Sequence, residues 1–424
     1  NFANSNYVIN NDIYSIIGEL NSTLNRRTHN NFIIGFTANR DYRSSNGGVF
    51  PLVDIQLNGT TMTSFGYEPF TANNILNTNT FQIQDNLTHY VGKHTINAGI
   101  AYERFAFENT FAPTYYGHYT FNSLEDFYRS ANGDTGVNVR RYALTYSALE
   151  GGALPTARPV VAQTSAYLQD AFALNNRLKV TAGIRFDLPM YNDPEVTNPR
   201  ADTMTFRDEN YKPVKYSTGK LANRNILWSP RIGFNWNAKG NRDIQVRGGT
   251  GLFSGRPAFV WISNQLSNNG VLTGSMRFDN TKAYQFSPDV TRYIPSNPTT
   301  PPSYNLALTD PDFKFPQVWR SDLGADFKLP FGFVGTTEFM YTRTINNVAY
   351  LNVNQEKAAG TFSGPDNRLY FPGRGLSGNA QNNAMRVQDN ITDAILLTNT
   401  NKGYNYSVTF KLEKPFSNNW SAMM

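Results

Sequence analysis

The chain has 424 residues and no cysteine, and charged residues make up 17% of it, against about 25% in an ordinary soluble domain. No apolar run approaches the roughly 18 residues of a membrane-spanning helix, which excludes a helical membrane protein. The lack of cysteine excludes disulfide frameworks, thiolate metal sites and cysteine nucleophiles. The net charge is +6, but the basic residues are scattered, so we expect no nucleic acid as a partner.

In chain order, the dominant pattern is an alternation of apolar and polar residues, which is typical of a β-strand with one apolar face. Leu178–Asp187 shows it clearly, with leucine, valine, alanine, isoleucine and phenylalanine on one face. The pattern predicts about twelve strands, most of them of the nine or more residues that a tilted strand needs to cross a bilayer. The predicted strands lie at residues 12–24, 31–39, 79–91, 96–103, 161–174, 178–187, 231–236, 244–252, 319–329, 338–342, 404–412 and from Trp420 onward.

The connections between these strands alternate in length. Short turns rich in glycine, asparagine and proline are predicted at residues 25–27, 92–93, 175–176, 238–241, 330–332 and 415–419. Long connections lie between them, at residues 40–78, 108–160, 188–225, 254–317 and 347–402. Short turns on one side and long loops on the other indicate a transmembrane antiparallel β-barrel.

A soluble sandwich or propeller is the alternative for such strands, but its connections show no strict alternation of short and long. Charges in mid-strand, such as Arg185, Asp326 and Glu338, suit a water-filled lumen. Terminal aromatics on the apolar faces, such as Trp236 and Trp319, suit the interface of a membrane. The long connections total roughly 250 residues, and loops beyond about 15 residues are usually functional or disordered. We therefore expect an external face that contacts a ligand or partner.

Three blocks carry a resemblance to a known family. Residues 163–187 contain QTSAYLQD and LKVTAGIRFD on either side of a short turn, a strand pair similar to those of TonB-dependent outer-membrane receptors. Residues 229–265 and 315–342, which include SPRIGFNW and FPQVWRSDLGADFKLPFGFVGTTEFMYT, resemble the Oar-like branch of that family, found in Gram-negative bacteria including the Bacteroidota. The likeness extends over essentially the whole chain.

The resemblance implies a barrel of about 22 strands that is closed by a plug domain. It also implies upstream segments that couple the receptor to the TonB system. The chain starts at Asn1 without a methionine and stops at Met424 within a predicted strand, so we expect residues 1–424 to be a partial barrel domain. The plug, the energy-coupling residues and about ten strands would lie outside it, so no coupling residue is assigned here.

Several motifs are better explained by structure than by chemistry. His89 and His94 flank a turn, but a metal site needs three or four ligands, and none is assigned. The glycines at 248–251 lie inside an alternating strand, where close packing explains them better than phosphate binding. Asp310 and Asp312 are interpreted as turn residues. No catalytic set can be placed, so we expect neither an enzyme nor a cofactor.

The candidate contact residues are aromatic or basic residues of the long loops: Tyr115, Tyr116, Tyr119, Arg256, Phe259 and Trp261. The tyrosines precede a short helix predicted at Ser123–Tyr128 with Ser123 as its N-cap. These residues could face a ligand or partner, or they could form the hydrophobic cores of their own loops. For residues 253–265, the sequence also suggests a segment folded back over the lumen mouth.

Three functions follow as hypotheses. The first is an outer-membrane, TonB-dependent receptor and transporter for a large ligand bound at the extracellular loops. The second is a structural or assembly component whose loops hold a surface lipoprotein or another outer-membrane protein. The third, a passive porin, fits neither the long loops nor the resemblance. In each case the outer membrane's lipid and lipopolysaccharide would surround the strands.

Overall fold

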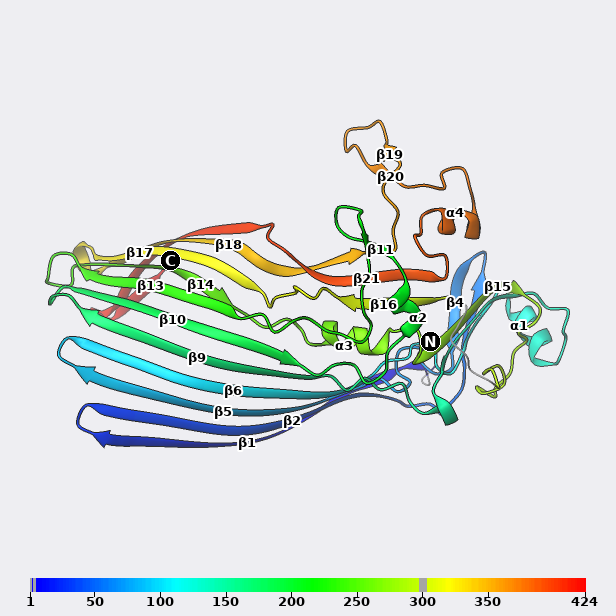
Figure 1. The fold of residues 1–424 in the computed structure, drawn as a ribbon, viewed down its shortest axis with the longest axis horizontal. Coiled ribbons are helices and arrows are strands. Elements are labelled where there is room, and N and C mark those ends of the chain that lie inside the picture. Colours follow the sequence, from blue (N-terminus) through cyan, green and yellow to red (C-terminus); the bar gives the residue numbers. More distant parts are fainter. Residues whose placement is uncertain (1, 3–4, 297–302) are drawn as a thin grey trace.

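The computed structural model describes residue 2, residues 5–296 and residues 303–424, and most of them lie in strands (Figure 1). The main sheet has 14 strands. Two of them, β16 (Tyr304–Thr309) and β21 (Ile391–Thr400), lie at one end, which leaves twelve antiparallel strands that we call the wall. The prediction of about twelve strands is thereby confirmed. The wall comprises β1 (Tyr7–Asn25), β2 (Thr28–Ser45), β5 (Ile75–Val91), β6 (His94–Thr110), β9 (Val160–Ala173), β10 (Leu178–Tyr191), β13 (Leu227–Asn237), β14 (Ile244–Ser254), β17 (Gln317–Lys328), β18 (Val334–Asn352), β22 (Tyr404–Ser417) and β23 (Trp420–Met423).

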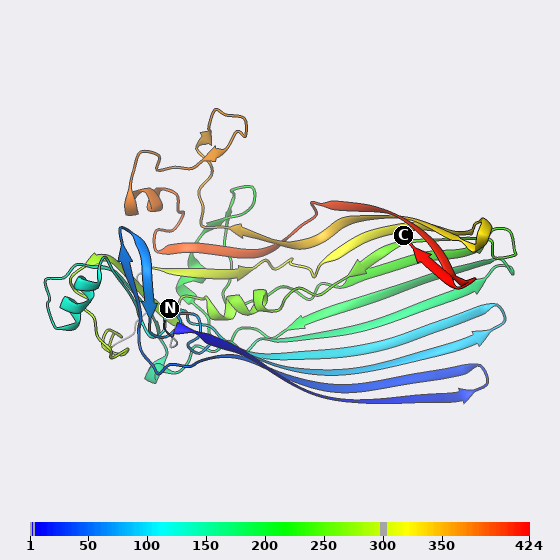
Figure 2. The same cartoon turned by 180° about the vertical axis from the view of Figure 1, so that it is seen from behind.

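The wall strands follow one another in chain order as hairpins, and their tight turns gather at one end of the molecule, while the long connections gather at the other (Figures 1 and 2). The predicted alternation of short and long connections is confirmed. One predicted turn was too long: β22 continues to Ser417, and the connection to β23 is only Asn418 and Asn419. Both asparagines have positive φ, 53° and 63°, a conformation that asparagine tolerates and that a two-residue hairpin turn requires.

Strand register places apolar side chains in rows on one face of the wall. Residues paired across antiparallel strands point to the same face. Phe186 pairs with Ala166 on one side and with Trp228 on the other, and Ala166 pairs with Ile100. Ile100 and Trp228 are 64% and 52% exposed, so this face is an open apolar surface. It is the face that the alternation assigned to lipid.

The opposite face is polar and concave. The segment that follows β14 places Arg256 against Glu103 of β6, although β9, β10 and β13 lie between these two strands in the sheet. At about 4.8 Å per strand, β6 and β14 would lie roughly 19 Å apart in a flat sheet. The contact fits a wall that curls toward this side, so that the polar face lines a lumen.

The long connections fold into structures of their own, which the sequence pattern did not predict. Segments from three of them form a five-stranded sheet, in the order β15-β8-β7-β3-β4, which we call the loop sheet. Its hydrophobic core is largely aromatic and includes Phe121, Val139 and Tyr142. The strands of the loop sheet are β3 (Leu52–Leu57), β4 (Thr60–Phe65), β7 (His118–Phe121), β8 (Val139–Ser147) and β15 (Thr273–Thr281).

Four helices complete the described part of the chain. The helix predicted at Ser123–Tyr128 is confirmed as α1 (Leu124–Ala131), and the Ser123 hydroxyl accepts a hydrogen bond from the Asp126 amide at 3.1 Å. Among the described residues, none of the helices has the length and apolar character needed to cross a membrane. The remaining elements are α2 (Pro199–Thr203), α3 (Val260–Ser267), α4 (Gly378–Ala384), the strand pairs β11 (Phe206–Arg207) with β12 (Pro213–Val214) and β19 (Gly360–Thr361) with β20 (Leu369–Tyr370), and 3-10 turns at Glu150–Gly152 and Pro330–Gly332.

The glycines at 248–251 lie inside β14, as predicted, and close packing explains two of them. A Cβ at Gly248 would lie 2.9 Å from the Asp322 carbonyl oxygen, and one at Gly251 would lie 2.9 Å from the Pro230 carbonyl oxygen. Real Cβ atoms do not approach backbone atoms this closely. The glycines therefore let β14 fit between its neighbours β13 and β17.

Candidate functional site

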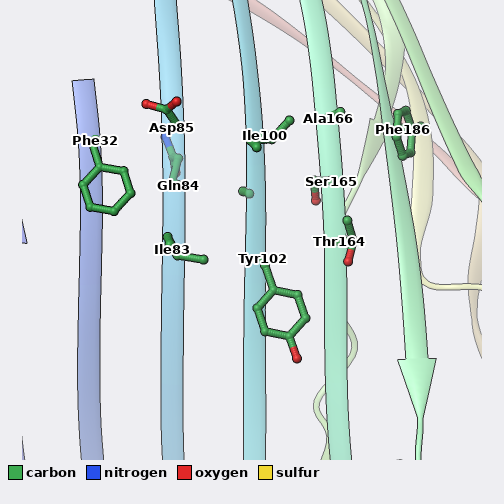
Figure 3. A pocket seen from close by; sticks show the side chains of 11 residues that line it. Phe32, Ile83, Gln84, Asp85, Ile100, Tyr102, Thr164, Ser165, Ala166 and Phe186 are labelled. Carbon is green, nitrogen blue, oxygen red and sulfur yellow. The ribbon is translucent and has the colours of Figure 1, made fainter. Parts of the chain in front are cut away.

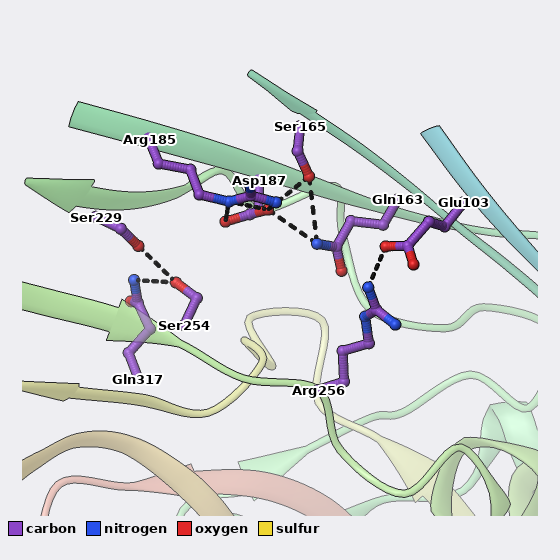
Figure 4. A network of polar contacts seen from close by, with 9 residues as sticks. All are labelled: Glu103, Gln163, Ser165, Arg185, Asp187, Ser229, Ser254, Arg256 and Gln317. Atoms are coloured by element: carbon purple, nitrogen blue, oxygen red, sulfur yellow. Dashed lines mark hydrogen bonds and ion pairs between the residues drawn. The ribbon is translucent and has the colours of Figure 1, made fainter. Parts of the chain in front are cut away.

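The polar face of the wall holds a buried carboxylate at the centre of a hydrogen-bond network (Figure 4). Asp187, at the loop end of β10, is 3% exposed. Its Oδ1 accepts hydrogen bonds from the Ser165 hydroxyl at 2.6 Å and the Gln163 amide at 2.9 Å, both on β9. The Arg185 guanidinium donates to the same oxygen at 2.7 Å. A carboxylate so enclosed is tolerated because each contact supplies a donor.

Toward the tight-turn end of the wall, the predicted lumen charges pair across strands. Arg247 of β14 forms an ion pair with Asp326 of β17 and lies 3.8 Å from the Glu338 carboxylate of β18. Toward the loops, the Ser254 hydroxyl contacts Ser229 at 2.9 Å and accepts from Gln317 at 3.0 Å (Figure 4). The inner face thus carries polar and charged side chains both near the tight turns and near the loops, as a hydrated passage requires.

Residues 255–267, which we call the strap, run from the end of β14 across the concave face. The Arg256 guanidinium forms an ion pair with Glu103 and lies over the Phe105 ring, 5.0 Å from its centre. Glu103 and Phe105 are both on the lumen side of β6. Phe259 follows, with its ring 5.0 Å from that of Phe105 and 5.5 Å from that of Phe107. The predicted fold of this segment over the lumen mouth agrees with these contacts.

The strap continues into α3, which is held in place by polar contacts. Gln265 is 1% exposed, and its amide nitrogen donates to the carbonyl oxygen of Lys220 at 2.8 Å and to that of Thr218 at 3.2 Å. The Ser263 hydroxyl accepts from the Asn109 amide at 3.0 Å. These bonds join α3 to β6 and to the connection between β10 and β13, so α3 is a fixed part of the mouth.

The structure separates the six candidate residues into two groups. Arg256, Phe259 and Trp261 lie on the strap, where Phe259 and Trp261 pack against a buried cluster that includes Phe315. The three tyrosines lie in or beside the loop sheet. No hydrogen bond, ion pair or ring contact joins the two groups within the described residues.

Tyr119 forms part of a core rather than a surface. It is 2% exposed, its ring lies 4.7 Å from that of Tyr142, and burial raises the pKa of its hydroxyl. The sequence left two interpretations open, a surface that faces a ligand and a hydrophobic core within the loop. Tyr119 fits the second interpretation. Tyr115 and Tyr116 are half-buried, and Tyr116 makes an edge-to-face contact with Tyr67 at 5.0 Å. Burial also raises the pKa of Tyr115.

Sequence reasoning overlooked an ion pair within the loop sheet. His118 of β7 contacts Asp54 of β3 at 2.8 Å, and the Ser64 hydroxyl donates to the same carboxylate. Burial favours a raised pKa for Asp54, but the hydrogen bonds from His118 and Ser64 and the charge of His118 outweigh it and lower the pKa. The two strands come from different connections, so no local pattern in the sequence could have joined these residues.

A hollow of about 440 Å³ lies on the opposite, apolar face of the wall (Figure 3). Phe32, Ile100, Tyr102 and Phe186 form its walls. Its one charged group, Asp85, accepts a hydrogen bond from the Asn30 amide at 2.6 Å. Because these residues belong to the apolar rows that face lipid, the hollow belongs to the membrane-facing surface.

The histidines of the turn between β5 and β6 have separate partners. His89 contacts the Thr28 hydroxyl at 2.9 Å, while His94 contacts Asp170 at 2.6 Å and stacks on Phe172. In the described ranges, no group of three or more histidine, cysteine or acidic residues could hold a metal ion. Asp310 accepts a hydrogen bond from the Asp312 amide at 2.9 Å, which confirms the predicted turn.

Residues 5–424 match the family model described as an outer membrane beta barrel domain. No curated protein matches the chain. The outer membrane transporter YddB from Escherichia coli is structurally similar, with a TM-score of 0.53 and 11% sequence identity over 97% of this chain and 40% of that one. The ferric-catecholate import receptor Fiu from E. coli matches with a TM-score of 0.45 and 12% identity, over 97% of this chain and 46% of that one. The chain therefore spans less than half the length of these solved relatives, and the likeness to YddB is one of fold.

Proposed function

The chain belongs to the outer-membrane β-barrel domain family, and from this premise we propose that it is part of a TonB-dependent receptor and transporter. Its strands cross the outer membrane, in contact with lipid and lipopolysaccharide, and its long connections face outward. In this proposal the connections bind a large ligand, and the TonB system drives its passage through segments outside these residues. The Oar-like, Bacteroidota-type assignment is retained as part of the proposal. The proposal includes neither an enzymatic activity nor a cofactor.

The observation that carries this proposal is the strap. A passive pore needs an open mouth, whereas residues 255–267 cross the concave face and are fixed there by Arg256, Phe259 and the anchors of α3. A wide barrel with a polar lining leaks unless something closes it. The strap closes part of the mouth from the loop side, as a selective receptor requires.

Locking the strap in place provides a direct test of a transport route past it. Residues 1–424 contain no cysteine, so Glu103→Cys with Arg256→Cys places the only two thiols of this segment side by side, and a cleavable bifunctional thiol reagent can bridge them. Cells with the unbridged protein remove certain compounds from their medium. We expect this removal to stop when the two thiols are bridged and to resume when the bridge is cleaved. Cells that carry Glu103→Cys alone and receive the same reagent are the control. Equal depletion with and without the bridge would contradict a transport route past the strap.

The second candidate is an assembly role, and the loop sheet favours it. This sheet has its own core, and its outer strand β4 begins with exposed residues, including Met62 at 64%. A folded unit with an open strand edge is suited to pairing with another protein. A stoichiometric surface lipoprotein or outer-membrane protein that co-purifies from native membranes would support this role. A chain that purifies alone and monodisperse would count against it.

A further inference from the structure

A cleft of about 300 Å³ is lined by residues of α3 and of the strands β16, β18 and β21, beside the lumen mouth. Figures 1 and 2 show where these elements lie in the fold. We propose that this cleft is a binding site for the neutral, hydroxyl-rich units of a carbohydrate. The inference deepens the proposed function and rests on it, because the mouth of a receptor is where such a ligand would arrive. The volume falls at the lower end of the range for small-molecule sites, so the cleft suits a short portion of a longer chain.

Two aromatic rings form one corner of the cleft. The Trp261 and Tyr350 rings lie 6.1 Å apart and nearly perpendicular, at 89°. Trp261 is half-buried, while Tyr350 is 51% exposed. The C–H bonds of a sugar ring carry partial positive charge, and the faces of aromatic rings are negative. The corner therefore offers an apolar surface that a sugar ring can cover.

Three asparagine side chains supply the polar part of the cleft. Asn264 lies within α3, Asn268 is the C-cap of α3, and Asn305 lies on β16. Within the described part of the chain, none of these three amides makes a side-chain hydrogen bond. Each amide offers two donors and an acceptor, and a hydroxyl group can both donate and accept. Free amides beside an aromatic corner therefore match the groups that alternate around a sugar ring.

The charge of the cleft favours a neutral ligand. Asp393 is the only acidic or basic residue that lines the described cleft, and its Oδ1 already accepts a hydrogen bond from the Asn352 amide at 2.8 Å. The cleft has no arginine or lysine to bind an anionic chelate or a sulfated sugar. A carboxylate with one oxygen still available can accept a hydrogen bond from a hydroxyl group.

An extended peptide fits less well. Peptides commonly bind by adding a strand to an open sheet edge, and β16 is the edge strand here. Its Ala307 amide, however, donates to the carbonyl oxygen of Asn268 at 2.8 Å, so the end of α3 already occupies part of that edge. Because Gln265 and Ser263 hold α3 in place, the cleft is formed before any ligand binds.

The test uses the full-length protein, purified in detergent and applied to immobilised short neutral oligosaccharides and, separately, to an immobilised peptide library. We expect at least one oligosaccharide to bind, and Trp261→Ala to weaken its binding by about tenfold or more, as for a central aromatic contact. Trp261 also packs against a core, so Asn305→Leu provides a second variant at an exposed position that removes the amide. We expect it to weaken binding by about fivefold, as the loss of one hydrogen bond does. Tyr128→Ala, an exposed tyrosine on α1, is the matched control.

Each other outcome would overturn the inference. If oligosaccharides bind but neither Trp261→Ala nor Asn305→Leu weakens them, the carbohydrate site lies elsewhere. If only peptides bind, and the same variants weaken them, the cleft is a peptide site. If the wild-type protein binds neither panel, the cleft is not a binding site. The cross-linked strap tests transport without using these ligands, so the proposed function can fail or survive independently.

Discussion

Removal of Arg185 should destabilise the wall more than its partial exposure suggests, because Arg185 balances a buried charge. The Asp187 side chain is 4% exposed and that of Arg185 is 34% exposed. In Arg185→Met, the carboxylate keeps its hydrogen bonds from Ser165 and Gln163 but loses the one cation that pairs with it among the described residues. Breaking a buried pair costs about 3–5 kcal/mol. Since the Arg185 guanidinium is partly hydrated, we expect Arg185→Met to lower the free energy of unfolding by about 2–3 kcal/mol.

The double variant Arg185→Met with Asp187→Asn isolates the charge effect. Asparagine keeps the shape and accepts from Ser165 without a net charge, so the double variant should lose only about 1 kcal/mol, the net value of an ordinary hydrogen bond. The double variant should therefore be roughly 1–2 kcal/mol more stable than Arg185→Met alone. Lys179→Met is the matched control, because Lys179 is an exposed cation on the same strand and the same face.

The measurement is urea unfolding of the protein refolded in lipid vesicles, followed by tryptophan fluorescence. Arg185→Met should lower the midpoint clearly, while Lys179→Met should leave it nearly unchanged, since surface substitutions usually stay within about 0.5 kcal/mol. If Arg185→Met and Lys179→Met unfold at the same urea concentration, the lumen is wet enough to hydrate Asp187. The network would then contribute no specific stability.

Three further predictions concern the loop sheet and the wall. Tyr119→Ala should destabilise the loop sheet by about 3–5 kcal/mol, as for a large core residue, and limited proteolysis should cut its strands while the wall stays resistant; unchanged cleavage would contradict a core role. The lowered pKa of Asp54 should stabilise the loop sheet above the ordinary value of 3.8 and lose this contribution as the pH falls through the lowered pKa. In Asp54→Asn, limited proteolysis of the loop sheet should therefore depend less on pH in the range where the Asp54 carboxylate takes up a proton. If proteolysis depends on pH in the same way in the variant and in the wild type, the Asp54–His118 contact is not the cause of that dependence. Gly251→Val should prevent correct pairing of β14, because its Cβ would meet the Pro230 carbonyl oxygen at 2.9 Å; the heat-modifiable gel shift of a folded barrel should disappear, and a normal shift would refute the packing argument.

The sequence predicted the wall well because the relevant signal is local. Alternation along one strand depends only on neighbouring side chains, and a tight turn depends on a few residues with suitable φ. The strands, their lipid and lumen faces and the ends at which they turn could therefore be predicted. The helix at α1 was found for the same reason, since the Ser123 cap and the residues it caps lie within one turn.

The length of the wall strands was underestimated. β1 and β18 each have 19 residues, whereas about 9–11 residues cross the bilayer. Beyond the membrane, a strand no longer separates a lipid face from a wet one, so its residues lose the alternation that identifies it. The extra length carries the hairpins outward, where the connections can meet one another.

The amino-acid sequence by itself determined a β-strand wall with one apolar face, tight turns at one end and polar, aromatic loops at the other. Only the tertiary structure decided that Tyr119 is core and that Arg256 reaches Glu103 across three intervening strands. It also brought Trp261 of α3 to Tyr350 of β18, two residues far apart in the chain. The physical reason is that strand pattern and turn chemistry act between neighbours, whereas the loop sheet, the strap and the cleft are made by contacts between segments that meet only after the wall has curled.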